Sequence, residues 1–230
     1  MEKRPVPSGL LLLAVAGWAF GAVTEDVLDQ DDLARLDGPV LAWVAGHRAA
    51  WLTGVVRVVS GLSSNRVLVP LLALVGVAVG LRARRWALPA VLALVQLGAT
   101  GSYLLVKQAV DRPRPPVAAL VDVHNQLGFP SGHATQAAAF WGVLAWLAVR
   151  LSPRRRSRPV VVAVWTAALC VTLAVGGSRV YLGVHWPTDV LGGWALGGLW
   201  LALVLLAWTT LERRGGRPAR PDTTDLDARR

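Results

Sequence analysis

The sequence has very little cysteine, methionine or charge. Cys170 is the only cysteine among 230 residues, methionine occurs once, and charged residues make up 17%. A single thiol excludes a disulfide within the chain and any metal site built from several cysteines. We expect Cys170, which lies in an apolar run, to be a small core residue. Charges are also too few to give every helix the polar face that a soluble helical bundle requires.

Apolar residues, in contrast, are abundant. They make up 54% of the chain, and the mean hydropathy is +0.47. A membrane-spanning helix needs about 20 mainly apolar residues, and six stretches of this kind lie at 9–23, 67–81, 86–106, 132–149, 160–175 and 187–211. The sequence therefore predicts an all-α fold, a polytopic membrane bundle of about six transmembrane helices. We expect one membrane domain at 1–212 and a disordered polar tail at 213–230.

The first apolar stretch resembles a signal peptide because Lys3 and Arg4 precede it. An acidic segment stands where a cleavage site would be, so we expect a retained helix. Residues 24–66 are more polar, with apolar residues at helical spacing, and this pattern favours helices that lie in the membrane interface. This region is also able to cover an active site.

Basic residues are unevenly distributed among the predicted loops. Six spans place both termini on one side, and 16 of the 24 Lys and Arg residues fall on that side. The positive-inside rule predicts that this side, with both termini, is cytoplasmic, in a multi-pass protein of the plasma membrane. The same rule explains the net charge of +10 without a nucleic-acid partner.

Polar residues gather at three places that this topology puts on the extracytoplasmic side. One group follows the third span, a second opens the fourth, and a third lies between the fifth and sixth. Ionisable groups this close to lipid are candidates for function, above all when several converge. The groups are Lys107, Arg112 and Arg114; Ser131, Gly132 and His133; and Ser178, Arg179, His185 and Asp189.

The residue types in these groups suit phosphoryl transfer. Fixed cations, for which Lys107, Arg114 and Arg179 are the candidates, neutralise the charge on phosphoryl oxygens. Ser131 is placed to cap the fourth span, and Gly132 permits close backbone approach, so the N–H groups of this helix start can bind an anion. The sequence therefore predicts a phosphate site.

Two histidines supply the remaining chemistry. Hydrolysis through a covalent intermediate needs a nucleophile and an acid for the leaving oxygen, and His185 and His133 are the candidates. Pro187 is suited to the first turn of the sixth helix, which puts Asp189 near His185. A carboxylate on one ring nitrogen would orient His185 and leave the other nitrogen free to attack phosphorus. We therefore expect Asp189 to orient the nucleophile.

The three groups resemble the signature of the PAP2, or type 2 phosphatidic acid phosphatase, superfamily. Its motifs are Lys-x6-Arg-Pro, Pro-Ser-Gly-His and Ser-Arg-x5-His-x3-Asp, and they match residues 107–115, 130–133 and 178–189. The resemblance implies a phosphohistidine on His185, leaving-group protonation by His133, and no metal or other cofactor. It also implies phosphate contacts from Lys107, Arg114, Ser131, Gly132 and Arg179.

Family analogy makes a lipid phosphate the expected substrate, and undecaprenyl diphosphate our first choice. Phosphatidic acid, phosphatidylglycerol phosphate and a polyprenyl phosphosugar are alternatives within this class. From another class, the chain could be a phospholipid binder or transporter without catalysis, which the intact histidines disfavour. A vanadium haloperoxidase has a similar anion site, but those proteins are soluble.

Other residues receive weaker interpretations. Arg112 is either a substrate contact or a solvated loop charge, and His47 and His124 receive no site role. Glycines of the sixth span are spaced for close helix contact, within the bundle or in a homo-oligomer. They are Gly192, Gly193, Gly197 and Gly198.

Overall fold

The computed structural model describes residues 6–123, 125–154 and 157–215, and this part of the chain forms eight helices. A loop at 111–131 is pinned by an isolated antiparallel bridge between Pro113 and Leu127. The helices are α1 (Val6–Asp29), α2 (Asp32–Gly46), α3 (Ala50–Gly61), α4 (Asn65–Ala83), α5 (Ala87–Val110), α6 (Gly132–Leu151), α7 (Arg158–Tyr181) and α8 (Pro187–Gly215).

Six of these helices, α1 and α4 to α8, are long and apolar enough to cross a membrane. The predicted all-α fold with six spans is therefore confirmed. Several helices run further than their apolar stretches predict, and the largest extensions are those of α1, which continues to Asp29, and α7, which continues to Tyr181. Because α7 ends only just before Gly183, whose φ of +74° turns the chain, Arg179 lies in its last turn.

The helix α6 is the centre of the bundle. In its most apolar 18-residue window 56% of the residues are buried, against 11% in α1. Small residues let its neighbours approach closely. A Cβ on Gly193 of α8 would lie 2.7 Å from the Ser131 carbonyl oxygen, and one on Gly197 would meet that of Thr135. A Cβ on Gly192 would meet the ring of Phe129 in the 111–131 loop, whereas Gly198 faces open space. The predicted close helix contact therefore applies to Gly193 and Gly197, Gly192 packs closely against the loop, and Gly198 has no close contact.

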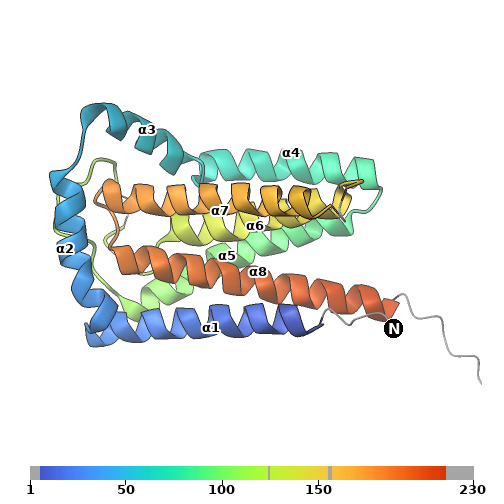
Figure 1. Cartoon of the computed structure of the whole chain (residues 1–230), viewed down its shortest axis with the longest axis horizontal. Coiled ribbons are helices and arrows are strands. Elements are labelled where there is room, and N and C mark those ends of the chain that lie inside the picture. Colours follow the sequence, from blue (N-terminus) through green and yellow to red (C-terminus); the bar gives the residue numbers. More distant parts are fainter. Residues whose placement is uncertain (1–5, 124, 155–156, 216–230) are drawn as a thin grey trace, which may run out of the picture.

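The two shorter helices cross one end of the bundle (Figure 1). Together with the end of α1, they occupy most of the segment at 24–66 for which interfacial helices are predicted. In α2 the buried side chains are Asp37 and Leu41, whereas Leu36 and Trp43 are exposed. Contact of these exposed residues with the membrane interface stays a prediction.

The start of α1 and the end of α8 lie at the bundle end opposite α2 and α3 (Figure 1). An even number of spans requires this arrangement. The ends of α5 and α7 and the starts of α6 and α8 consequently lie at the same end as α2 and α3. All three polar sequence motifs are at these helix ends.

Two expectations are revised. Cys170 is exposed on α7 instead of buried, because lipid replaces protein as the apolar surroundings of an outer helix face. Of the tail predicted to be disordered, residues 213–215 continue α8, and residues 216–230 lie outside the described part of the chain.

Candidate active site

A cavity of about 660 Å³ opens at the end of the bundle where the motifs meet. Six of the eight predicted site residues line it, and they come from α5, the 111–131 loop, α6, α7 and the turn before α8. These six are Lys107, Arg114, Gly132, His133, Arg179 and His185. Tertiary packing therefore brings most of the predicted site to one surface.

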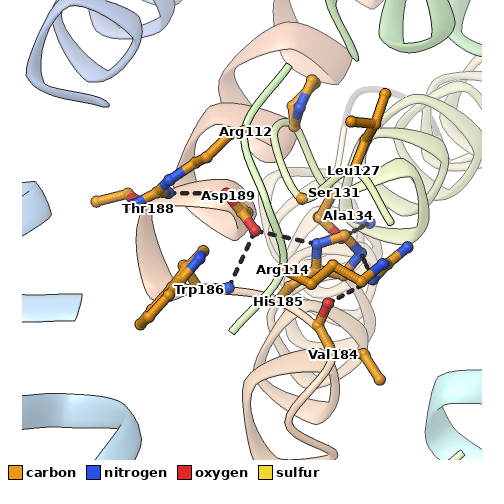
Figure 2. Close-up of polar contacts among 12 residues, drawn as sticks. Arg112, Arg114, Leu127, Ser131, Ala134, Val184, His185, Trp186, Thr188 and Asp189 are labelled. Atoms are coloured by element: carbon orange, nitrogen blue, oxygen red, sulfur yellow. Dashed lines mark hydrogen bonds and ion pairs between the residues drawn. The ribbon is translucent and has the colours of Figure 1, made fainter. Parts of the chain in front are cut away.

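His185 lies between a carboxylate and a guanidinium (Figure 2). Its Nδ1 is 3.2 Å from Asp189 Oδ2, and its Nε2 is 3.3 Å from Arg114 Nη1. A guanidinium can only donate, so Nε2 must accept, and the ring proton belongs on Nδ1, where it is donated to Asp189. This tautomer leaves a lone pair on Nε2, on the side of the ring away from Asp189.

The surroundings of His185 favour its neutral form. Burial lowers its pKa well below the usual 6.5, and the positive charges of Arg114, Lys107 and Arg179 lower the pKa further. The imidazole is therefore unprotonated at neutral pH, as a nucleophile must be.

Asp189 is held in position from several directions. Pro187 begins α8, which places Asp189 in the first helical turn as expected. Its Oδ2 also accepts from the Trp186 N–H at 3.0 Å, and its Oδ1 accepts from Arg112 Nη1 at 2.8 Å. Since the carboxylate is fully buried, these donors take the place of water.

Arg112 has neither of the roles left open for it from the sequence. It is only 8% exposed, it is not part of the cavity wall, and it pairs with two buried carboxylates. Its Nη2 lies 2.7 Å from Asp37 Oδ2, and its Nη1 contacts both Asp189 and the Thr188 hydroxyl. Asp37 is not among the residues predicted from sequence, although one signal was present: Asp37 shares a helix face with Leu33 and Leu41.

The three cations predicted to bind phosphate differ in the protein groups with which they already form hydrogen bonds. Lys107 Nζ donates to the carbonyl oxygens of residues 127, 128 and 130 at 2.9–3.0 Å, so it ties the loop to α5. Arg114 contacts Asn125 and the Val184 carbonyl as well as His185. Arg179 Nη1 donates to Ser60 Oγ at 2.6 Å, but its buried Nε has no acceptor among the described residues. Arg179 thus lines the cavity with one guanidinium N–H that is unpaired within the described residues.

The start of α6 is built as the sequence predicts, with one difference. Ser131 caps the helix, its Oγ accepting from the Ala134 N–H at 3.4 Å. Ser131 is fully buried and is not part of the cavity wall, unlike Gly132 and His133. Its predicted contact with phosphate stays a prediction, and in the structure Ser131 orders the helix start that Gly132 exposes. The described residues contain no group of three or more His, Cys, Asp or Glu side chains placed to hold a metal.

The fold and the site define a multi-pass membrane protein with a buried histidine–aspartate pair beside a cationic cavity. A family model described as "PAP2 superfamily" matches residues 84–213, which is more than half of the chain. The chain therefore belongs to the PAP2 superfamily, as the motifs indicated, and is a lipid phosphatase.

Individual relatives agree with this assignment. Phosphatidylglycerophosphatase B of Bacillus subtilis is 35% identical over 87% of this chain and 93% of its own. A decaprenylphosphoryl-5-phosphoribose phosphatase of Mycobacterium tuberculosis is 38% identical over 58% of this chain and 68% of its own. An undecaprenyl-diphosphatase of Sulfolobus acidocaldarius is 31% identical over 50% of this chain and 48% of its own. The crystal structure of a PAP2 type phosphatidylglycerolphosphate phosphatase from Bacillus subtilis superposes with a TM-score of 0.78 at 27% identity, covering 90% of this chain and 98% of its own.

Proposed function

We propose that the protein hydrolyses a lipid phosphate on the extracytoplasmic face of the plasma membrane, without a metal, through a phosphohistidine on His185. The observation that carries this proposal is the placement of His185, with Nδ1 on Asp189 and the Nε2 lone pair beside Arg114 in the cavity. This is the geometry of an oriented nucleophile next to a site for anionic oxygens.

The reaction has two steps. In the first, His185 Nε2 attacks phosphorus, the P–O bond to the lipid breaks, and His133 gives a proton to the leaving oxygen. In the second, water loses a proton to His133 and attacks the phosphohistidine, so that the P–N bond breaks and inorganic phosphate leaves. Arg114 and Arg179 stabilise the charge on the phosphoryl oxygens in both steps.

Phosphatidylglycerol phosphate and undecaprenyl diphosphate are the substrates to compare first. Phosphatidylglycerol phosphate is favoured by phosphatidylglycerophosphatase B of Bacillus subtilis, which matches 87% of this chain. Undecaprenyl diphosphate is favoured by the Sulfolobus relative and by our expectation from the sequence. Phosphatidic acid and a polyprenyl phosphosugar are the further alternatives. A catalytically silent lipid-phosphate binder would not need the Asp189–His185 pair.

Phosphate release by the purified protein in detergent with a chelator present tests the proposal. We expect release from at least one of these lipids, and loss of release in His185→Ala. Wild-type turnover by a folded His185→Ala protein would refute the histidine mechanism. Binding of the lipids without release would instead favour the silent binder.

A further inference from the structure

We propose that Asp37 and Arg112 are positioning residues that act on His185 through Asp189. This inference rests on the proposed function, because it assigns His185 as the nucleophile. Asp37 lies on α2, outside residues 84–213 that the family model matches and outside all three motifs.

A continuous chain of charged contacts carries the proposal. Asp37 Oδ2 is 2.7 Å from Arg112 Nη2, Arg112 Nη1 is 2.8 Å from Asp189 Oδ1, and Asp189 Oδ2 is 3.2 Å from His185 Nδ1. The last two contacts are visible in Figure 2. Asp37 is 2% exposed and Asp189 fully buried, so water does not screen these charges.

The charges in this chain suit the reaction. A buried carboxylate without a partner tends to take up a proton, and a protonated Asp189 could donate to Nδ1 and reverse the histidine tautomer. The charge of Arg112 keeps Asp189 an acceptor. With Asp37 included, the three groups together carry one negative charge, which stabilises the positive ring that forms when Nε2 is phosphorylated.

Asp37 also fixes the backbone on which Asp189 stands. Its Oδ1 accepts from the Thr188 N–H at 2.9 Å, and its Oδ2 accepts from the Thr188 hydroxyl. The first turn of α8 is therefore attached to α2 by a charged residue. A shift of this turn would move Asp189 relative to His185.

A double-mutant cycle distinguishes positioning from a purely structural role. Asp37→Asn keeps the size of the side chain and removes its charge, and Arg112 remains paired with Asp189. With dioleoyl phosphatidic acid in detergent micelles, we expect kcat to fall about tenfold, the effect of one charge-assisted hydrogen bond. We expect KM to change less than about twofold, because Asp37 is not in the cavity wall.

In an Asp189→Asn background the same substitution should lower kcat less than about twofold, because the residue through which it acts is gone. The inference is overturned if Asp37→Asn lowers kcat as much in the Asp189→Asn background as in the wild type, or if Asp37→Asn alone keeps the wild-type kcat. Asp32→Asn, at an exposed position of α2, is the matched control. If Asp37→Asn does not fold, Arg112→Lys takes its place in the cycle with the same expectations. An active His185→Ala would defeat the proposed function itself, which is a separate outcome.

The cavity carries a second, independent inference, which also rests on the proposed function. We propose that its wall at the α3–α4 corner holds a second anionic group of the substrate. Arg57 and Arg66 line the same cavity as His185, so five cations surround it, whereas Asp122 is the single acidic side chain in its described wall. One reacting phosphate does not need five cations.

The corner also offers uncharged hydrogen-bonding groups. Ser63 is fully buried, lines the cavity, and has a hydroxyl without a partner among the described residues. Arg57 donates to the Leu120 carbonyl through Nε and Nη2, whereas Arg66 is exposed at the start of α4. Arg66 is therefore the arginine whose replacement disturbs the fold least.

Two matched pairs of substrates test this subsite. Dioleoyl phosphatidylglycerol phosphate and dioleoyl phosphatidic acid share their tails, and only the first has a second phosphate. Farnesyl diphosphate and farnesyl phosphate form the pair in which the phosphates are adjacent. We expect Arg66→Gln to lower kcat/KM about tenfold for a two-phosphate substrate and less than about twofold for its one-phosphate partner.

Arg66→Lys should recover part of the loss, and Arg35→Gln, on α2 and outside the cavity, should have no effect. Selectivity in the first pair would mean that the subsite suits phosphates separated by glycerol, and selectivity in the second that it suits a diphosphate. The inference is overturned if Arg66→Gln lowers kcat/KM equally for the two substrates of each pair, or if it lowers kcat/KM for none of them. Absence of release by the wild-type protein from all four lipids would count against the proposed function instead.

Discussion

The backbone N–H of Ser131 donates to the carbonyl oxygen of Asp189 at 2.9 Å. This bond joins the cap of α6 to the first turn of α8, so the helix start that faces the cavity and the carboxylate that contacts His185 are fixed to each other. One turn further along α8, Gly193 packs against the carbonyl oxygen of Ser131. The geometry of the site therefore depends on how closely these two helices approach.

Gly193→Ala should destabilise the protein by about 1–3 kcal/mol, the usual effect of overpacking. A Cβ at this position would lie 2.7 Å from Ser131 O and 2.8 Å from Ala134 Cβ. Gly198→Ala is the matched control, because its Cβ would meet open space. Thermal unfolding of both variants in detergent measures the difference, and equal unfolding temperatures would contradict the close packing.

His185→Ala should abolish turnover without unfolding the protein, because it removes the only atom proposed to bond phosphorus. Radioactive phosphate transferred from substrate and trapped by acid quench should label the wild-type protein and not the variant. His47→Ala, at the exposed position that follows α2, should label normally. Labelling of His185→Ala would assign the nucleophile to another residue.

Asp189→Asn should lower kcat by about a thousandfold or more, because an amide can stabilise the wrong tautomer of the histidine. We expect little loss of folding, since Arg112 remains paired with Asp37 and no lone buried charge is left. Steady-state kinetics together with the unfolding temperature test both parts. A large fall in unfolding temperature would show that Asp189 is required mainly for the fold.

His185 should make the stability of the protein depend on pH in the acid range. Its folded pKa lies well below 6.5 because of burial and neighbouring cations, whereas the unfolded residue titrates near 6.5. On acidification the unfolded state binds the proton first. The stability that the folded state has with neutral His185 is therefore fully present above about pH 6.5 and is lost as the pH falls toward the folded pKa. Between about pH 7.5 and pH 5.5, the unfolding temperature of the wild type should therefore fall more than that of His185→Gln. Equal falls would exclude a large pKa shift at His185.

The membrane bundle and most of the site could be predicted from sequence. Long apolar stretches determine spanning helices because lipid requires every backbone group to bond within its own helix. The three motifs could be grouped because consecutive spans run in opposite directions, which puts the ends of the third and fifth spans and the starts of the fourth and sixth on one side. The near neighbours His185 and Asp189 were paired correctly because Pro187 starts a helix between them.

Only the tertiary structure decided the roles of Arg112, Asp37 and Lys107. Arg112 and Asp37 are 75 residues apart, and no local spacing indicates that α2 places a carboxylate beside the first turn of α8. Lys107 has the position of a phosphate ligand in its motif, but the folded 111–131 loop gives its ammonium three carbonyl oxygens. Residue type and helix periodicity thus determined which groups reach this end of the bundle, whereas long-range packing decided which of them face the cavity and which hold it in shape.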